Sequence, residues 1–218
     1  MDGAFHVKHQ LQPPEAFLRR AAAIGVDLSP EAGRELLRFA DLLLEEALPR
    51  GFVSAADAPR LLERHVLDCL RAARALEPTD RSLVDLGSGA GLPGLVLALA
   101  RPGIDVRLVE PRGRRAAFLE LALERLRVRN ARVTVSSAEE LGRLVASGAE
   151  PPADLCTARA LAPLERCASL AHPILRPGGR LVWFAGARWS KGRLPPGARV
   201  LDARGLESGG PLVIMARR

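Results

Sequence analysis

Cysteine is scarce in this chain of 218 residues, and its spacing matches neither a disulfide framework nor a metal site. The three cysteines, Cys69, Cys156 and Cys167, form an odd set that contains no C-x-x-C pair. Disulfide frameworks use even numbers of cysteines, and closely spaced pairs are typical of structural zinc sites. The sequence therefore predicts no bound metal, and each cysteine is interpreted as a small core residue.

Long apolar runs are also missing. The longest stretch without a charged residue, Leu86 to Ala100, is too short and too rich in glycine to cross a bilayer. The first ten residues, MDGAFHVKHQ, contain no apolar segment of the kind found in signal peptides. Because 48% of the residues are hydrophobic, the chain still has enough apolar surface for a full core. We expect a cytoplasmic monomer with no membrane attachment.

Lysine is almost absent, although the formal net charge is +7. All but two of the 32 basic residues are arginine, the exceptions being Lys8 and Lys191. GC-rich coding alone produces such a bias, so the charge does not by itself identify a partner. Arginine nevertheless pairs well with phosphate, and the excess favours a polyanionic partner such as nucleic acid.

The pattern of apolar residues changes near residue 80. Helices are predicted before it at Pro14–Ile24, Pro30–Leu48 and Asp57–Leu76. After it, short apolar strands alternate with helices. The strands are predicted at Ser82–Leu86, Asp105–Val109, Arg132–Val135, Ala153–Thr157, Arg180–Phe184, Val200–Ala203 and Leu212–Ala216. The helices between them are predicted at Pro93–Ala100, Arg112–Leu126, Ala138–Val145 and Pro163–Leu175.

This alternation predicts an α/β fold with a mostly parallel, Rossmann-like sheet. The last two strands follow each other without a helix, so we expect an antiparallel pair at the sheet edge. Residues 1–80 are interpreted as a helical N-terminal extension and residues 81–218 as the cofactor-binding domain.

A glycine-rich turn, VDLGSGAGLPG at 84–94, follows the first strand and opens a helix. It contains two overlapping patterns. Gly89 to Gly94 fits the G-x-G-x-x-G of dinucleotide sites. Asp85 with Gly87, Gly89 and Gly91 fits the acidic-G-x-G-x-G turn of S-adenosylmethionine sites.

Asp85 favours S-adenosylmethionine as the cofactor. A carboxylate facing the ligand would repel a pyrophosphate and attract the ammonium and sulfonium groups of the methyl donor. Pro93 also removes a backbone N–H that a pyrophosphate would use. Glu110, at the end of the second strand, is expected to bind ribose hydroxyls. Ala138 and Glu139, after the third strand, lie where such enzymes present backbone and an acid to adenine.

The segment after the fourth strand, TARALAPL at 157–164, contains no histidine or carboxylate placed as a general base. Guanine N7 already has an in-plane lone pair, so its methylation needs alignment more than proton removal. Arg159 is then expected to contact the cofactor or the guanine edge, since it donates hydrogen bonds but cannot act as a base. A surface ion pair remains the alternative.

Six stretches in this order resemble the RsmG family, the bacterial small-subunit rRNA guanine-N7 methyltransferases, in its actinobacterial branch. They are LLERHVLDCL (61–70), VDLGSGAGLPGLVLALARPG (84–103), RRAAFLELALERL (114–126), SSAEEL (136–141), TARALAPL (157–164) and LRPGGRL (175–181). The resemblance implies methyl transfer from S-adenosylmethionine to N7 of a guanine in the 530-loop region of 16S rRNA. It also implies cofactor contacts at Gly87, Leu92, Ala138, Glu139 and Arg159.

Two family motifs differ in this chain. Gly51-Phe52-Val53 stands where the family often has Asn-Leu-Thr, and Ala185-Gly186 stands where it has Lys-Gly. The phosphate contact of that lysine is then expected from Arg188 or Lys191. Further candidates for RNA contact are Arg64, Arg112, Arg114 and Arg115.

Arg64, His65 and Asp68 lie together in the third predicted helix. Arg64 and Asp68 are four residues apart and are expected to share a helix face as an ion pair. His65 either packs the helix on the sheet or lines the guanine pocket, which makes it, with Arg159, a candidate catalytic residue.

The expected partner is small-subunit rRNA or the 30S particle. Two alternatives stay open. One is a methyltransferase that acts on a small molecule or a protein. The other is a non-catalytic RNA- or ribosome-binding protein.

Overall fold

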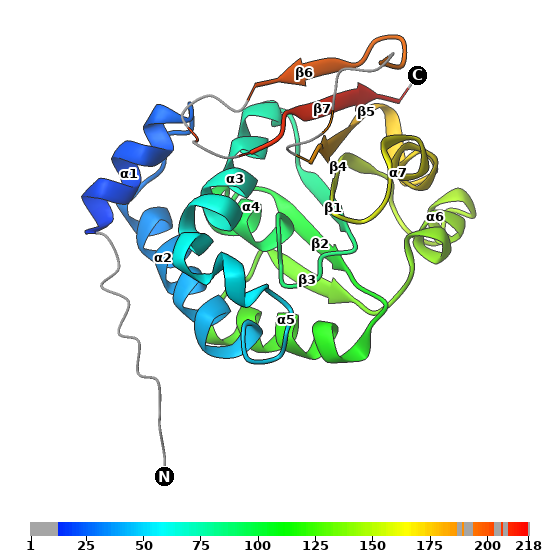
Figure 1. Ribbon diagram of the computed structural model, residues 1–218. Coiled ribbons are helices and arrows are strands. Elements are labelled where there is room, and N and C mark those ends of the chain that lie inside the picture. Colours follow the sequence, from blue (N-terminus) through cyan, green and yellow to red (C-terminus); the bar gives the residue numbers. More distant parts are fainter. Residues whose placement is uncertain (1–12, 187–188, 190–193, 203–205, 207–208, 218) are drawn as a thin grey trace.

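A seven-stranded sheet forms the centre of the computed structural model, which describes residues 13–186, 189, 194–202, 206 and 209–217 (Figure 1). The strands are β1 (Ser82–Leu86), β2 (Asp105–Val109), β3 (Ala131–Thr134), β4 (Ala153–Arg159), β5 (Leu175–Phe184), β6 (Arg199–Leu201) and β7 (Leu212–Ala216). Their order is β3-β2-β1-β4-β5-β7-β6, and only β7 runs antiparallel to its neighbours. The predicted α/β fold with an antiparallel edge is therefore confirmed.

Helices cover both faces of this sheet. In chain order they are α1 (Pro14–Ala23), α2 (Pro30–Leu42), η1 (Leu43–Ala47), η2 (Ala55–Arg60), η3 (Leu62–Leu67), α3 (Asp68–Leu70), η4 (Arg71–Ala75), α4 (Gly94–Ala100), α5 (Gly113–Arg125), α6 (Ala138–Ala146) and α7 (Leu164–Ala171). Serine caps begin three of them, α2, η2 and α6. Ser29 accepts from the backbone N–H of Ala32 at 3.1 Å, and Ser137 accepts from that of Glu140 at 3.1 Å.

The predicted helix over Asp57–Leu76 is wrong as a single α-helix. The chain instead passes through 3₁₀, π, α and 3₁₀ turns, in η2, η3, α3 and η4. Pro59 lies inside the first of these and has no N–H for an α-helical bond. The helix predicted as Pro30–Leu48 likewise ends in a π turn, η1.

Strands β4 and β5 extend beyond their predicted bounds. β4 continues to Arg159, which places that residue at the end of the strand. β5 begins at Leu175, so the Pro-Gly-Gly stretch at 177–179, between the predicted helix and the predicted strand, belongs to the strand. Gly178 has a φ of +74°, and the register with β4 shifts between Ala153 and Leu155. The local bulge explains why the turn residues occur inside a strand.

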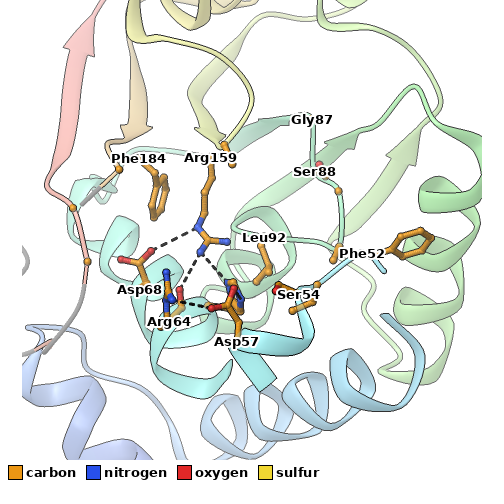
Figure 2. Close-up of a pocket in the computed structure, with 18 of the residues that line it drawn as sticks. Phe52, Ser54, Asp57, Arg64, Asp68, Gly87, Ser88, Leu92, Arg159 and Phe184 are labelled. Atoms are coloured by element: carbon orange, nitrogen blue, oxygen red, sulfur yellow. Dashed lines mark hydrogen bonds and ion pairs between the residues drawn. The ribbon is translucent and has the colours of Figure 1, made fainter. Parts of the chain in front are cut away.

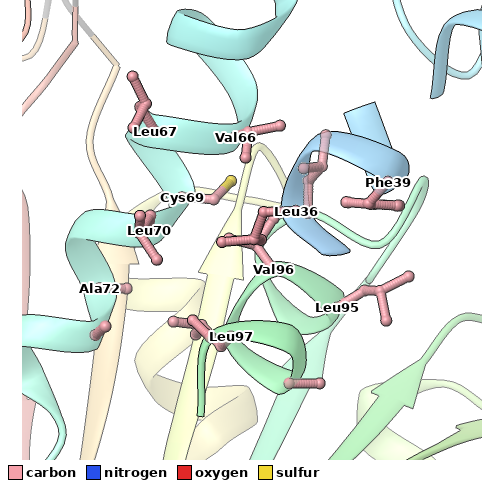
Figure 3. Packing of buried hydrophobic residues seen from close by; sticks show 14 of the residues in the cluster. Leu36, Phe39, Val66, Leu67, Cys69, Leu70, Ala72, Leu95, Val96 and Leu97 are labelled. Atoms are coloured by element: carbon pink, nitrogen blue, oxygen red, sulfur yellow. The ribbon is translucent and has the colours of Figure 1, made fainter. Parts of the chain in front are cut away.

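Successive residues of the central strands point to opposite faces and join two buried clusters. Leu83, for example, faces a cluster built with α1 to α5, whereas Val84 faces one built with α6 and α7. Figure 3 shows part of the first cluster, in which Leu36 and Phe39 of α2 lie near Val96 of α4. The N-terminal helices thus share a core with the sheet, and the domain boundary near residue 80 stays a prediction.

The strand order reverses direction between β1 and β4, which are hydrogen-bonded neighbours. In open α/β sheets, ligands bind at the carboxyl ends of the strands at such a reversal. Within the described part of the chain, no helix is long and apolar enough to span a membrane. The same residues contain no cluster of metal-ligating side chains.

Gly94 and Gly113 are the first residues of α4 and α5, and substitutions at these two positions test the packing of the core. A Cβ on Gly94 would lie 2.5 Å from Cδ2 of Leu108 and 2.7 Å from Cβ of Asp85, whereas one on Gly113 would meet nothing within 4 Å. We expect Gly94→Ala to lower the free energy of unfolding by about 1–3 kcal/mol through overpacking. Gly113→Ala should leave it unchanged or raise it by up to about 1 kcal/mol. Urea unfolding followed by circular dichroism measures both, and equal effects would contradict the packing described here.

Candidate active site

A cavity of about 550 Å³ opens at the carboxyl ends of β1, β4 and β5. The turn after β1 forms its floor, and Arg159 and Ala160 after β4 form a second side. The remaining wall comes from the N-terminal region, with Phe52, Val53, Ser54, Asp57, Arg64, His65 and Asp68, and from the C-terminal region, with Phe184 to Gly186, Gly209 and Gly210. Segments far apart in the sequence therefore meet at one site.

The glycine turn exposes its backbone to this cavity. Gly87 and Gly89 both have positive φ angles, +69° and +57°, which favour glycine. A Cβ on Gly89 would find no atom closer than 3.8 Å, so the space beside it is open. A Cβ on Gly87 would lie 2.8 Å from Cδ1 of Leu161. Beside Gly89, the turn thus leaves room for a ligand against the main chain.

Asp85 is turned away from the cavity, which corrects the expectation that its carboxylate faces the ligand. Its Oδ2 accepts from the backbone N–H of Gly94 at 3.0 Å, and its Oδ1 accepts from the hydroxyl of Thr157 at 2.7 Å. The residue is only 1% exposed. Burial raises the pKa of Asp85 to about 6, against the opposing effect of these hydrogen bonds. Asp85 therefore joins the turn, α4 and β4, and is not a direct charge partner for a sulfonium.

Glu110 also supports the turn. Its Oε2 accepts from the N–H of Gly89 and its Oε1 from the N–H of Arg112, both at 2.9 Å. Its carboxylate is buried and does not line the cavity. The two acids that flank the glycine turn thus hold its backbone in place.

Arg159 and His65 are in contact at the cavity, and Figure 2 shows Arg159 beside Arg64 and Asp68. Nη2 of Arg159 donates to Nδ1 of His65 at 2.9 Å and to the carbonyl oxygen of Arg64 at 3.0 Å. Asp57 binds Arg64 at 2.8 Å, and its other carboxylate oxygen lies 3.4 Å from Nε2 of His65. Burial, followed by the charge of Arg159, lowers the pKa of His65 to about 4. His65 is therefore neutral near pH 7.

The expected ion pair between Arg64 and Asp68 is not formed. Arg64 pairs with Asp57 instead, and Asp68 pairs with Arg71 and lies 3.6 Å from Nε of Arg159. The reason is the π-helical turn of η3, whose i→i+5 pattern offsets residues four positions apart.

A buried arginine links this region to the last part of the chain. Arg71 donates to the carbonyl oxygens of Gly210 at 2.9 Å and Asp202 at 3.2 Å, besides its ion pair with Asp68. A Cβ on Gly209 would lie 3.1 Å from Oδ1 of Asp68. The Gly209–Gly210 wall of the cavity is thus fixed against α3.

The structure brings some of the predicted site residues together and leaves others apart. Those that line the cavity are Arg64, His65, Gly87, Gly89, Leu92, Arg115 and Arg159. Those that do not are Asp85, Gly91, Glu110, Arg112, Arg114, Ala138 and Glu139. Gly91 faces the core, where a Cβ would lie 3.2 Å from Cζ of Phe39, and Glu139 pairs with Arg166. Arg188 and Lys191 lie outside the described residues.

Several cavity residues were missed in the sequence, above all Phe52, Asp57 and Asp68 as lining residues. Phe52 packs edge-on against Phe118 at 5.9 Å, and the guanidinium of Arg115 lies 5.8 Å from its ring centroid. The signal for Phe52 was its place in the altered Gly51-Phe52-Val53 motif. No sequence pattern pointed to Asp57 as a cavity residue, because its contacts depend on how η2 folds against η3.

Comparison with known families explains this arrangement. The family model GidB, described as rRNA small subunit methyltransferase G, matches residues 33–192. This chain belongs to that family. The resemblance seen in the sequence is thereby confirmed, and the match includes the glycine turn, His65 and Arg159. Gly209 and Gly210 lie beyond it.

Curated relatives agree with the family. The chain is 47% identical over 151 residues to ribosomal RNA small subunit methyltransferase G of Salinispora arenicola, an alignment that covers 68% of this chain and 62% of the relative. It is 34% identical over 185 residues to the protein of the same name from Corynebacterium diphtheriae, covering 85% of this chain and 77% of the relative. The chain thus spans less than two thirds of the Salinispora relative.

Solved structures show the same fold at low identity. A mutant of MtNAS in complex with S-adenosylmethionine has a TM-score of 0.54 and 16% identity, covering 94% of this chain and 78% of that one. TrmN from Thermus thermophilus has a TM-score of 0.50 and 22% identity, covering 73% of this chain and 52% of that one.

The buried position of Asp85 predicts a pH-dependent stability. Folding raises the pKa of Asp85 from 3.8 to about 6, so its protonated form stabilises the folded state and this contribution is lost as the pH rises through 6. Asp85→Asn carries no charge and keeps an acceptor for Gly94. We expect the free energy of unfolding of the variant, relative to the wild type, to increase between about pH 4 and pH 8 by on the order of 3 kcal/mol. Urea unfolding at several pH values measures it, and a constant difference would contradict the assignment.

Proposed function

We propose that this chain transfers a methyl group from S-adenosylmethionine to N7 of a guanine in the 530-loop region of 16S rRNA. The observation that carries the proposal is the joining of the glycine turn with the Arg64, His65 and Arg159 group around one cavity. All of these residues lie in the part of the chain that matches the family model.

The cavity suits S-adenosylmethionine in its volume and in its donors. About 550 Å³ is within the range of sites that hold small organic ligands. The open space beside Gly89 admits a ligand against the backbone, with Gly87, Leu92 and Arg159 as further contacts. Glu110, Ala138 and Glu139 follow β2 and β3 at the same carboxyl edge of the sheet but do not line the cavity, so their expected contacts with ribose and adenine stay predictions. When bound, the cofactor supplies a methyl group on a sulfonium.

The residues around the cavity can align a guanine but cannot deprotonate one. The carboxylates of Asp57 and Asp68 are paired with arginines, and Nδ1 of His65 already accepts from Arg159. N7 needs no base, because its lone pair lies in the ring plane and takes the methyl directly. In such a transfer the S–CH3 bond would break as the N7–CH3 bond forms, so the residues around the cavity would have to move no proton. The donors of Arg159 are suited to an acceptor on the guanine edge or on the cofactor.

RNA is the partner that the charges around the cavity favour. Arg115 lines the cavity and makes no ion pair with the described residues, and Arg112 and Arg114 are exposed at the start of α5. We assign these three arginines and Arg64 to phosphate contacts, together with Arg188 and Lys191. We propose that the protein acts in the cytoplasm, as a monomer, on small-subunit rRNA or on the 30S particle.

The test is transfer of labelled methyl groups to 30S particles, naked 16S rRNA and a protein extract in parallel. We expect label in rRNA, at a guanine of the 530-loop region that becomes sensitive to cleavage at 7-methylguanosine. Label in protein alone would favour a different methyl acceptor. A failure of calorimetry to detect S-adenosylmethionine binding would favour a non-catalytic RNA-binding protein.

Arg115 allows a separate test of RNA docking. If it neutralises one phosphate, Arg115→Ala should raise the KM for the RNA substrate and reduce the slope of log KM against log salt by about 1. Arg38→Ala is the matched control, because Arg38 is an exposed arginine of α2 that pairs with Glu35. A slope unchanged by Arg115→Ala would remove this residue from the interface.

A further inference from the structure

The guanidinium of Arg159 is held by two hydrogen-bond acceptors and one carboxylate, all from a single stretch of the N-terminal region. Nη2 donates one hydrogen to the carbonyl oxygen of Arg64 at 3.0 Å and the other to Nδ1 of His65 at 2.9 Å. Nε lies 3.6 Å from Oδ2 of Asp68 (Figure 2). These contacts fix both the direction of the side chain and the plane of its end group.

One nitrogen of Arg159 is left over by this arrangement. No described residue accepts from Nη1, and the side chain of Arg159, 20% exposed, lines the cavity. Nη1 therefore presents two N–H donors in a plane that its neighbours set. An arginine without these neighbours would sample many rotamers, and ordering it on binding would cost conformational entropy.

The protonation state of His65 follows from the same contacts. A guanidinium donates and cannot accept, so Nδ1 of His65 must carry the lone pair and Nε2 the proton. Nε2 is buried and makes no hydrogen bond with the described residues, and it lies 3.4 Å from Oδ2 of Asp57. The charged groups around the ring are Asp57, Arg64, Asp68 and Arg159, and together with burial they lower the pKa of His65 to about 4.

We propose that His65 is a positioning residue for methyl transfer: its unprotonated Nδ1 fixes Arg159 so that Nη1 faces the reacting guanine and the methyl donor. The proposal rests on the function proposed above. It gives His65 no role as a base, because its lone pair is already bound and its proton lies on the other nitrogen. Protonation of Nδ1 would replace the hydrogen bond by two facing cations and release Arg159.

Three substitutions of His65 distinguish a positioning role of this residue from a packing role and from a role as a catalytic base. Asn carries an acceptor close to the place of Nδ1, whereas Gln reaches the place of Nε2 and Leu only fills the volume. We expect His65→Leu and His65→Gln to lower kcat/KM by about 10-fold or more, since a displacement of 1 Å in an active site can cost about 100-fold. His65→Asn should restore activity close to that of the wild type. His172→Asn, at the end of α7 and outside the cavity, is the control for loss of a histidine.

The other outcomes overturn the proposal. If His65 only fills space, His65→Leu will be the mildest of the three and His65→Asn the most harmful. If His65 is a base, all three will lose activity alike and the acidic limb of the pH–rate profile will disappear. Under the proposal, His65→Asn keeps the profile at neutral and alkaline pH and removes only a fall in rate near pH 4.

A spectroscopic measurement tests the geometry without activity. Nitrogen NMR of the ring should show His65 neutral at pH 7, with the proton on Nε2 and a hydrogen-bonded Nδ1 that changes in Arg159→Leu. A proton on Nδ1 would overturn the proposal even if methyl transfer to rRNA is observed. Conversely, absence of methyl transfer with the expected tautomer would count against the proposed function and leave the contact between His65 and Arg159 intact.

Discussion

The hydrogen bonds of one buried carboxylate determine how this site is built. Asp85 ends up between the N–H of Gly94, where α4 begins, and the hydroxyl of Thr157 in β4. β1 and β4 are the strands between which the sheet reverses direction, so this residue joins both sides of the reversal. The glycine turn between β1 and α4 is held by Glu110, which accepts from the N–H of Gly89, and by Asp85, which accepts from the N–H of Gly94. Ionising such a buried group costs free energy, and the hydrogen bonds offset part of that cost.

Much of the fold follows from local sequence patterns. Strands that are buried on both faces read as short apolar runs, and the turn at 84–94 requires glycine where φ is positive. These features were predictable because each depends on a few consecutive residues. The family was equally predictable, since its motifs are contiguous stretches.

The remaining features depend on contacts between distant segments. The motif located Asp85 but could not indicate that its carboxylate points inward, because Gly94 and Thr157 approach it only in the folded protein. The pairing of Arg64 with Asp57 depends on a π turn that no spacing rule for α-helices predicts. The Pro-Gly-Gly stretch was not predicted as part of a strand because turns and bulges use the same residues.

The contacts of Arg71 bear on the order in which the walls of the cavity assemble. It joins Asp68 to the carbonyl oxygen of Gly210, a residue 139 positions further along the chain. During synthesis the glycine turn, His65 and Arg159 all emerge long before that residue, so β1 to β5 can form around a cavity that still lacks one wall. Arg71 meanwhile has two of its acceptors missing, and a buried guanidinium without partners is unfavourable. Closure of the site therefore depends on the segment that carries Asp202 and Gly210.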